Sequence, residues 1–265
     1  MLHIEQVSKV FNPGSPDEKL ALSHINLQLR AGEFVTIIGS NGAGKSTLMN
    51  LISGVLFPDI GSISIGNQAV TSMPEHARSR FIGRVFQDPM AGTAPSMTIE
   101  ENLAIAKRRG KRRGLSFGVK RADRKWFKEQ LATLGIGLDD RLQAKAGLLS
   151  GGERQALSLL MATFMKPKLL LLDEHTAALD PARAELITTL TERIVQEHQL
   201  TTLMVTHNME QAIRLGNRLI MMDKGRIILD IGAEQKRKLT VDKLLYEFER
   251  IRGAKLADDR VVLGG

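Results

Sequence analysis

A glycine-rich segment near the N-terminus has residue types that could bind a polyphosphate. Residues 39–47 read Gly39, Ser40, Asn41, Gly42, Ala43, Gly44, Lys45, Ser46 and Thr47, between a β-branched run and an apolar helical run. This is the P-loop pattern in its strand–loop–helix context. Glycines allow positive φ, so successive N–H groups can face phosphate oxygens, and the following helix adds the positive end of its dipole. We expect Lys45 to contact the β- and γ-phosphates, Ser46 to contact Mg²⁺, and Thr47 to reach the α/β region.

Two acids follow a second apolar run. Residues 169–172 are four leucines, and Asp173 and Glu174 come directly after them. In open α/β sheets, ligands bind outside the carboxyl ends of the strands. We therefore expect Asp173 to hold Mg²⁺ through water, and Glu174 to act as the base toward the attacking water. An acid pair alone would indicate only a polar turn, but the P-loop earlier in the chain favours the catalytic interpretation.

A second possible phosphate-binding element lies at residues 150–153, with the sequence Ser150, Gly151, Gly152 and Glu153. A serine hydroxyl and glycine amides at the start of a helix can bind a γ-phosphate. Since the chain already has a P-loop, this element makes sense only if it closes on the polyphosphate bound by another copy. The alternative interpretation is an ordinary N-capped helix with a flexible Gly-Gly entry.

Residues 149–155, Leu-Ser-Gly-Gly-Glu-Arg-Gln, closely resemble the signature sequence of ABC ATPases. The resemblance extends over residues 2–232 and implies further roles. Gln87 resembles the Q-loop glutamine that contacts Mg²⁺ or the attacking water, and Asp180 resembles the D-loop residue at the dimer contact. His207 resembles the switch histidine that touches the γ-phosphate. Phe11 resembles the A-loop aromatic that stacks on adenine, with a core phenylalanine as the alternative.

His175 departs from the family pattern, in which most members have proline between the catalytic glutamate and the following threonine. It could be a local turn variant, or it could contact the partner copy. Residues 173–180 also look like those of a subgroup associated with bacterial uptake of small solutes, including amino acids such as tryptophan or tyrosine.

The pattern along the chain predicts an α/β fold. We expect a P-loop NTPase core with a mostly parallel sheet, an N-terminal antiparallel β subdomain and a helical insertion subdomain. The ATPase domain is predicted over residues 1–233, with the helical subdomain at about 88–160 inserted within it. Residues 234–265 are predicted to be a charged, partly helical C-terminal extension, which could regulate, support a dimer or simply fray.

The composition excludes several classes of protein. The 265 residues include no cysteine, so disulfide scaffolds and thiolate metal sites are excluded. No apolar run approaches the length of a membrane span, and the N-terminus does not resemble a signal peptide. The formal net charge is +8, with a basic run at residues 107–113. That run could be a solvated loop or a contact with anionic lipid or a membrane partner; nucleic acid is the least favoured partner because no aromatic residue interleaves the run.

Together the resemblance implies an ATP-hydrolysing subunit with ATP and Mg²⁺ as cofactors, acting at the cytoplasmic face of a bacterial membrane. Its implied partners are a second copy of itself, polytopic permease subunits and, for an importer, an extracytoplasmic solute-binding protein. Import of a small solute is favoured because unfused ATPase subunits occur mainly in bacterial importers. The alternatives are the ATPase of an exporter and a soluble assembly factor.

Overall fold

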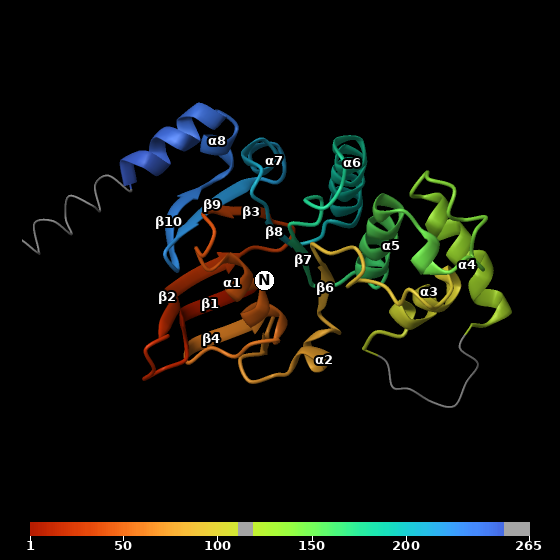
Figure 1. Ribbon diagram of the computed structural model, residues 1–265, viewed down its shortest axis with the longest axis horizontal. Helices are drawn as coiled ribbons and strands as arrows, with labels where there is room; N and C mark the ends of the chain where they lie inside the picture. The colour runs from red at the N-terminus through yellow and green to blue at the C-terminus, as the bar shows by residue number, and fades with distance from the viewer. Residues whose placement is uncertain (111–118, 252–265) are drawn as a thin grey trace, which may run out of the picture.

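The computed structural model describes residues 1–110 and 119–251 of the chain. It contains two sheets with helices packed between and around them (Figure 1). The strands are β1 (Leu2–Phe11), β2 (Lys19–Leu29), β3 (Phe34–Gly39), β4 (Ile60–Ile65), β5 (Gln68–Ala69), β6 (Ile82–Val85), β7 (Leu169–Asp173), β8 (Thr202–Val205), β9 (Arg218–Asp223) and β10 (Arg226–Ile231). The helices are α1 (Lys45–Ser53), α2 (Glu75–Arg78), α3 (Ile99–Lys107), α4 (Arg121–Ala132), the 3₁₀ helix η1 (Ala146–Leu148), α5 (Gly151–Thr163), α6 (Pro181–His198), α7 (Met209–Arg214) and α8 (Ala233–Lys236).

The six-stranded sheet carries the candidate site. Its order is β10-β9-β3-β8-β7-β6, and all neighbours are parallel except β10, which pairs antiparallel with β9. Leucines of β7 alternate between two hydrophobic cores: Leu169 and Leu171 face one, and Leu170 and Leu172 face the other. A run that is apolar at every position is what a strand covered on both faces requires. The carboxyl ends of β3, β7 and β8 therefore meet at one edge of the sheet, where the sequence has its P-loop, its acid pair and His207.

The four-stranded sheet is antiparallel, with the order β2-β1-β4-β5. The C-terminal half of β2 alternates buried and exposed residues, as its sequence pattern predicts. Buried residues of β1, β2 and β4 share a core with α1 and with one face of the central sheet, so α1 lies between the two sheets. The predicted fold class, a P-loop core with a mostly parallel sheet and an N-terminal antiparallel sheet, is confirmed.

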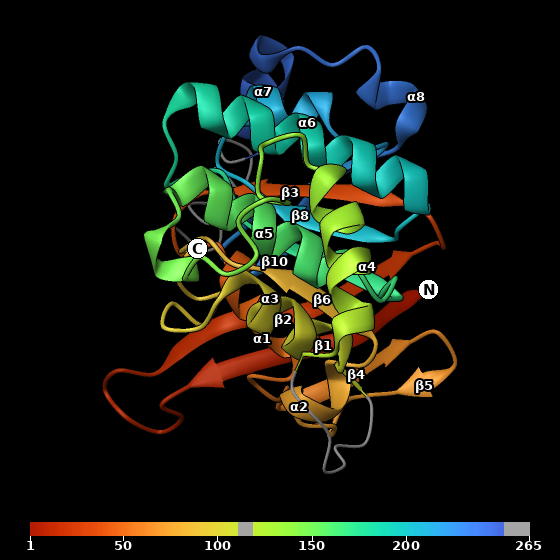
Figure 2. The same ribbon diagram turned by 90° about the vertical axis from the view of Figure 1, so that its right-hand side faces the viewer.

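Helices α3, α4 and α5 gather at one end of the molecule (right in Figure 1). Figure 2, which faces that end, shows them in front of the central sheet. They share one core with α6 and the second face of the sheet, and Phe127 and Leu131 of α4 are fully buried in it. Thr98 begins α3 with a capping box, in which its hydroxyl accepts from Glu101 N–H and the Glu101 carboxylate accepts from Thr98 N–H.

The part of the C-terminal extension that the structure describes packs against the protein. Residues 241–251 are helical, and fully buried Leu244 joins a third hydrophobic core with Ile38, Ala212 and Met221. Lys236 of α8 is buried, and its Nζ donates to Thr36 Oγ1 at 3.1 Å and to the Leu215 carbonyl. The extension is therefore not frayed as far as residue 251, and residues 252–265 lie outside the described part of the chain.

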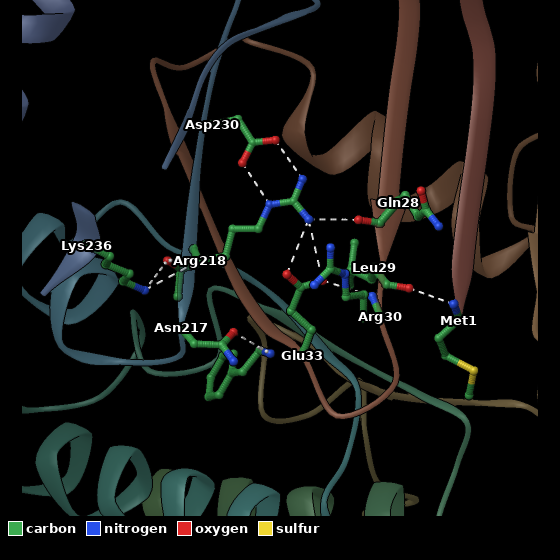
Figure 3. Close-up of polar contacts among 11 residues, drawn as sticks. Met1, Gln28, Leu29, Arg30, Glu33, Asn217, Arg218, Asp230 and Lys236 are labelled. Carbon is green, nitrogen blue, oxygen red and sulfur yellow. Dashed lines mark hydrogen bonds and ion pairs between the residues drawn. The ribbon is translucent and has the colours of Figure 1, made fainter. Parts of the chain in front are cut away.

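A cluster of polar side chains around Arg218 lies where β9 begins, whereas the P-loop follows the end of the parallel neighbour β3. Figure 3 shows Arg218 among Asp230, Glu33 and Gln28. Arg218 of β9 donates to both carboxylate oxygens of Asp230 in β10, at 2.7 and 2.6 Å, and to the Gln28 carbonyl of β2. Bonds to Asp230 raise the pKa of Arg218, with smaller contributions from Glu33. Arg218 therefore links the central sheet to the antiparallel sheet.

Candidate functional site

The P-loop runs from the end of β3 to the start of α1 in the conformation that its glycines allow. Gly44 stands at the N-cap of α1 with φ 98°, and a Cβ there would lie 2.7 Å from the Ala21 carbonyl oxygen. Both the left-handed φ and the close backbone approach exclude larger residues. Since α1 has no side-chain N-cap, its first N–H groups and the positive end of its dipole are available to an anion.

Lys45 is buried beside this loop. Its Nζ donates to the Gly39 carbonyl at 2.7 Å and to the Ser40 carbonyl at 3.1 Å. Burial lowers the pKa of Lys45, and the nearby Glu174 and Asp173 carboxylates oppose that shift. The ammonium group is thus held beside the loop by two carbonyl oxygens, which are weaker hydrogen-bond acceptors for it than phosphate oxygens.

A cavity of about 380 Å³ combines residues that lie far apart in the sequence. It is lined by Phe11 of β1, Lys19 and Ala21 of β2, residues 41–47, Gln87 and Glu174. The predicted adenine-stacking, phosphate-binding and water-activating side chains therefore face one space. Residues 150–153 and Asp180 do not line this cavity.

The two acids after β7 have different surroundings. Asp173 is paired with Arg84 of β6 at 2.9 Å, and both side chains are largely buried. Glu174 has a left-handed φ of 47°, and its N–H donates to the Val205 carbonyl at 2.9 Å. The Glu174 Oε2 lies 3.4 Å from His207 Nδ1, so these two predicted catalytic residues are neighbours.

Arg84 is a residue of the site that the sequence reasoning missed. Besides Asp173, its guanidinium donates to Asn50 Oδ1 at 2.9 Å and to Ser53 Oγ at 3.1 Å, both in α1. A signal was present in the sequence, since Arg84 is a charged residue between apolar neighbours three positions before Gln87. A charge inside a buried strand requires an opposite charge, which the structure provides from Asp173 of the neighbouring strand β7.

His175 turns away from the cavity into the protein. It is 1% exposed, and its Nε2 lies 3.0 Å from Thr191 Oγ1 of α6. Burial lowers the pKa of His175 to about 4, so the ring is neutral near pH 7. The alternative that His175 contacts a partner copy is therefore wrong, because the side chain is enclosed by its own chain.

Ser150 caps α5 in a capping box with Glu153. The Ser150 hydroxyl accepts from Glu153 N–H, and the Glu153 carboxylate accepts from Ser150 N–H at 2.7 Å and from Arg141 at 2.6 Å. Gly152 lies close to α6, since a Cβ there would be 3.0 Å from Arg183 Cδ. Asp180 in turn caps α6, accepting from Arg183 N–H at 3.1 Å. Both predicted helix starts are thus well ordered within one chain.

The first residues of the basic run make contacts within the protein. Lys107 pairs with Asp123 at 2.7 Å, and its Nζ lies 4.6 Å from the centroid of the Trp126 ring. Arg109 donates to the Ala162 carbonyl at 3.2 Å, and burial lowers the pKa of its guanidinium. Lys107 and Arg109 are therefore engaged, while residues 111–113 lie outside the described part of the chain.

The oxygen donors that the sequence assigns to Mg²⁺ suit a hard cation that also binds phosphate, and two of them, Ser46 and Gln87, line the cavity. Ser46 offers a hydroxyl, Gln87 an amide oxygen and Asp173 a carboxylate oxygen. This small set of oxygen donors fits Mg²⁺, which keeps several waters and takes substrate phosphates as ligands. Over residues 1–110 and 119–251, no group of three or more His, Cys, Asp and Glu side chains is placed to hold a metal ion. In the same residues, no helix is both long and apolar enough to cross a bilayer.

Comparisons with known proteins show what this chain is similar to as a whole. A family profile described as ABC transporter matches residues 22–177. A tyrosine transport ATP-binding protein of Clostridioides difficile is 43% identical over 249 residues, which span 94% of this chain and 99% of that protein. The energy-coupling factor transporter ATP-binding protein EcfA2 of Geobacillus kaustophilus is 33% identical over 84% of this chain and 76% of its own length. A solved dimer of the ATP-binding cassette MJ0796, bound to ADP and Pi, aligns with a TM-score of 0.74 and 30% identity, covering 88% of this chain and 99% of that one.

Proposed function

This chain belongs to the ABC transporter family, as an ATP-hydrolysing subunit. We propose that it works as a dimer that binds two Mg-ATP between its copies. One observation carries the proposal. The cavity with the P-loop and Glu174 has only one of the two predicted phosphate-binding elements, because residues 150–153 do not line it. A second copy packed head-to-tail would supply them. The dimeric MJ0796 cassette bound to ADP and Pi supports this arrangement.

In the proposed complex, residues 39–47 bind the phosphates and Phe11 stacks on the adenine. Lys45 exchanges the Gly39 and Ser40 carbonyls for phosphate oxygens, which gives it charged partners. Ser46, Gln87 and Asp173 would hold Mg²⁺, and the bound ion would neutralise part of the phosphate charge. Ser150, Gly151, Gly152 and Glu153 of the second copy contact the γ-phosphate, and Asp180 lies at the contact between copies.

Glu174 is the proposed base toward the attacking water, and His207 contacts the γ-phosphate. Their 3.4 Å separation supports a joint role, since both must face the same phosphate group. Hydrolysis and phosphate release would remove the ligand that both copies share, so the copies would separate. The ATPase domain of residues 1–233, with its helical subdomain at about 88–160, would pass this motion to the permease.

The substrate proposal is uptake of a small solute, with amino acids favoured. It rests on the tyrosine transport relative and on the resemblance of residues 173–180. Transport would take place through separate membrane permease subunits at the cytoplasmic face of the membrane, supplied by an extracytoplasmic solute-binding protein. Co-purification with a polytopic membrane protein separates this from a soluble assembly factor, and stimulation of hydrolysis by a loaded binding protein separates import from export.

The decisive experiment is Glu174→Gln in the purified chain. The expected result is ATP binding close to that of the wild type, loss of turnover and a stable dimer in ATP and Mg²⁺. Binding is measured by calorimetry, turnover by phosphate release and mass by light scattering. Turnover at the wild-type rate would refute the role of Glu174 as base, and a persistent monomer with ATP bound would refute the shared site.

A further inference from the structure

Gln211 occupies an unusual position at the start of α7, four residues after His207. Asn208 is the N-cap of α7, and its Oδ1 accepts from Gln211 N–H at 2.9 Å. In a capping box, the third helical residue would return its side chain to the N–H of the cap. Here Thr206 Oγ1 accepts the hydrogen bond from Asn208 N–H at 3.1 Å instead. The side chain of Gln211 is therefore left to make other bonds.

Those bonds connect three separate segments of the chain. Gln211 Oε1 accepts from Thr206 Oγ1 at 2.8 Å, and Nε2 donates to Thr188 Oγ1 at 2.9 Å and to Thr176 Oγ1 at 3.2 Å. The Thr188 hydroxyl itself donates to the Ala184 carbonyl at 2.7 Å, so its oxygen must accept from Gln211. That requirement assigns the orientation of the amide. One side chain thus joins the loop after β7, the loop after β8 and α6.

The two loops joined by Gln211 are the loops that carry Glu174 and His207. Thr176 follows Glu174 by two residues, and Thr206 directly precedes His207. Glu174 has the left-handed φ of 47°, a conformation that its surroundings must hold for a residue with a Cβ. Glu174, His207 and Gln211 also line one cavity of about 480 Å³.

A second buried bond holds the same loop to the same helix. His175 meets Thr191, which lies three residues after Thr188 on α6, and Thr188, Thr191 and Thr206 are all buried. Residues three apart share a helix face. The face of α6 toward the two loops therefore presents two threonine hydroxyls, one bonded to His175 and one to Gln211.

We propose that Gln211 is a positioning residue for ATP hydrolysis, which keeps Glu174 and His207 at the separation that the reaction needs. It acts through Thr176 and Thr206 and contacts neither the nucleotide nor the reacting atoms. This proposal rests on the proposed roles of Glu174 and His207. Displacement of a catalytic group by about 1 Å can lower a rate about 100-fold, so a residue that fixes two such groups should affect turnover more than binding.

The test is Gln211→Leu, which keeps the size of the side chain and removes its hydrogen bonds. We expect kcat to fall by about 10- to 100-fold. The KM for ATP should change by less than about twofold, because the P-loop and Phe11 are untouched. The matched control is Gln196→Leu, which should leave kcat unchanged. Gln196 is an exposed residue of α6, and its side chain donates to Glu192 of the same helix.

Thr188→Val provides a second measurement if Gln211→Leu does not fold. It removes the acceptor of Gln211 Nε2 and should lower kcat with KM unchanged. The double variant should lose less activity than the product of the two single losses, because both remove the same connection. Thr163→Val, whose hydroxyl bonds only within α5, is the control for a buried threonine.

Wild-type kcat in folded Gln211→Leu, or a rise in KM at constant kcat, would overturn the positioning role. If Gln211→Leu does not fold, wild-type kcat in Thr188→Val would overturn it. These results leave the proposed function in place as long as Glu174→Gln is inactive. An active Glu174→Gln variant would instead overturn the proposed function itself.

Discussion

Arg84 illustrates how single residues tie the nucleotide site to its scaffold. Its guanidinium binds the Asp173 carboxylate of β7 and two polar atoms of α1, the helix that begins at Lys45. The side chains of Arg84 and Asp173 are only 12% and 16% exposed. Because a largely buried carboxylate needs a partner, Arg84 holds the Asp173 side chain in place through this ion pair.

Arg84→Met is expected to lower the free energy of unfolding by about 3 kcal/mol, since it leaves the Asp173 carboxylate buried without its partner. Denaturant titration followed by circular dichroism measures this change. The control is Lys9→Met, which breaks a pair whose Asp59 side chain is 43% exposed and should cost less than about 1 kcal/mol. Equal losses in the two variants would contradict the structural role of Arg84.

At the scale of elements, the C-terminal segment packs against the central sheet. Leu244 and Phe248 of the helical residues 241–251 pack with Ile38 of β3, Met209 of α7 and their neighbours. Phe248 also lines a small cavity with Gly39, Ser40 and His207. The segment therefore supports the P-loop and the His207 loop from the side opposite the antiparallel sheet.

Two adjacent leucines test this packing. Leu244 is fully buried, whereas Leu245 is 39% exposed. Leu244→Ala is expected to lower the free energy of unfolding by about 3 kcal/mol, because it removes buried methyl groups and leaves a cavity. Leu245→Ala should cost less than about 1 kcal/mol. Similar small costs for both variants, measured by chemical denaturation, would show that the segment does not pack in solution.

Burial of Lys236 predicts how the stability of the protein depends on pH. Burial lowers the pKa of Lys236 from 10.5 to about 8 in the folded chain. Between about pH 8 and 10.5, the unfolded chain holds a proton that the folded chain has lost, so the free energy of unfolding rises with pH by at most about 1.4 kcal/mol per unit. Relative to Lys236→Met, the wild type should therefore gain stability as pH rises from 8 to 10. A difference that stays constant over this range would show that Lys236 is not buried.

At the scale of the whole molecule, the proposed site belongs to two copies. Lys45 and Glu174 line the same cavity, while Ser150 lies outside it. A defect at Lys45 and a defect at Ser150 would therefore fall on opposite sides of a shared site. Ser150→Asp is a suitable defect, because aspartate keeps the N-cap of α5 and its charge repels phosphate.

Mixing the Lys45→Ala and Ser150→Asp chains should give more hydrolysis than either variant alone. In a mixed dimer, one site combines the intact Lys45 of one copy with the intact Ser150 of the other. The control mixes Lys45→Ala with Glu174→Gln, which leaves a defect in both sites and should give no recovery. Phosphate release measures both mixtures, and a Lys45→Ala plus Ser150→Asp mixture no more active than the control mixture would contradict the shared site.

The sequence alone determined the local chemistry of this protein. Three patterns of neighbouring residues carried this information: the P-loop glycines, the acids after four leucines, and the Ser-Gly-Gly sequence. Backbone freedom, strand periodicity and helix capping were enough to predict the loop, the strand and the helix start at these positions. The fold class followed from the same periodicities and is confirmed. The short edge strands β6 and β10 could not be predicted in this way, because four to six residues of mixed polarity carry little periodic signal. The domain boundaries and the roles of the site residues stay predictions.

Only the tertiary structure decided which distant side chains meet. The strand order β3-β8-β7-β6 brings Arg84 to Asp173, Glu174 to His207 and Gln211 to three threonines. Each of these contacts joins residues of different elements, and the pairing depends on sheet order and helix packing, which no local pattern encodes. The same reason turned His175 inward toward α6 and left residues 150–153 outside the nucleotide cavity.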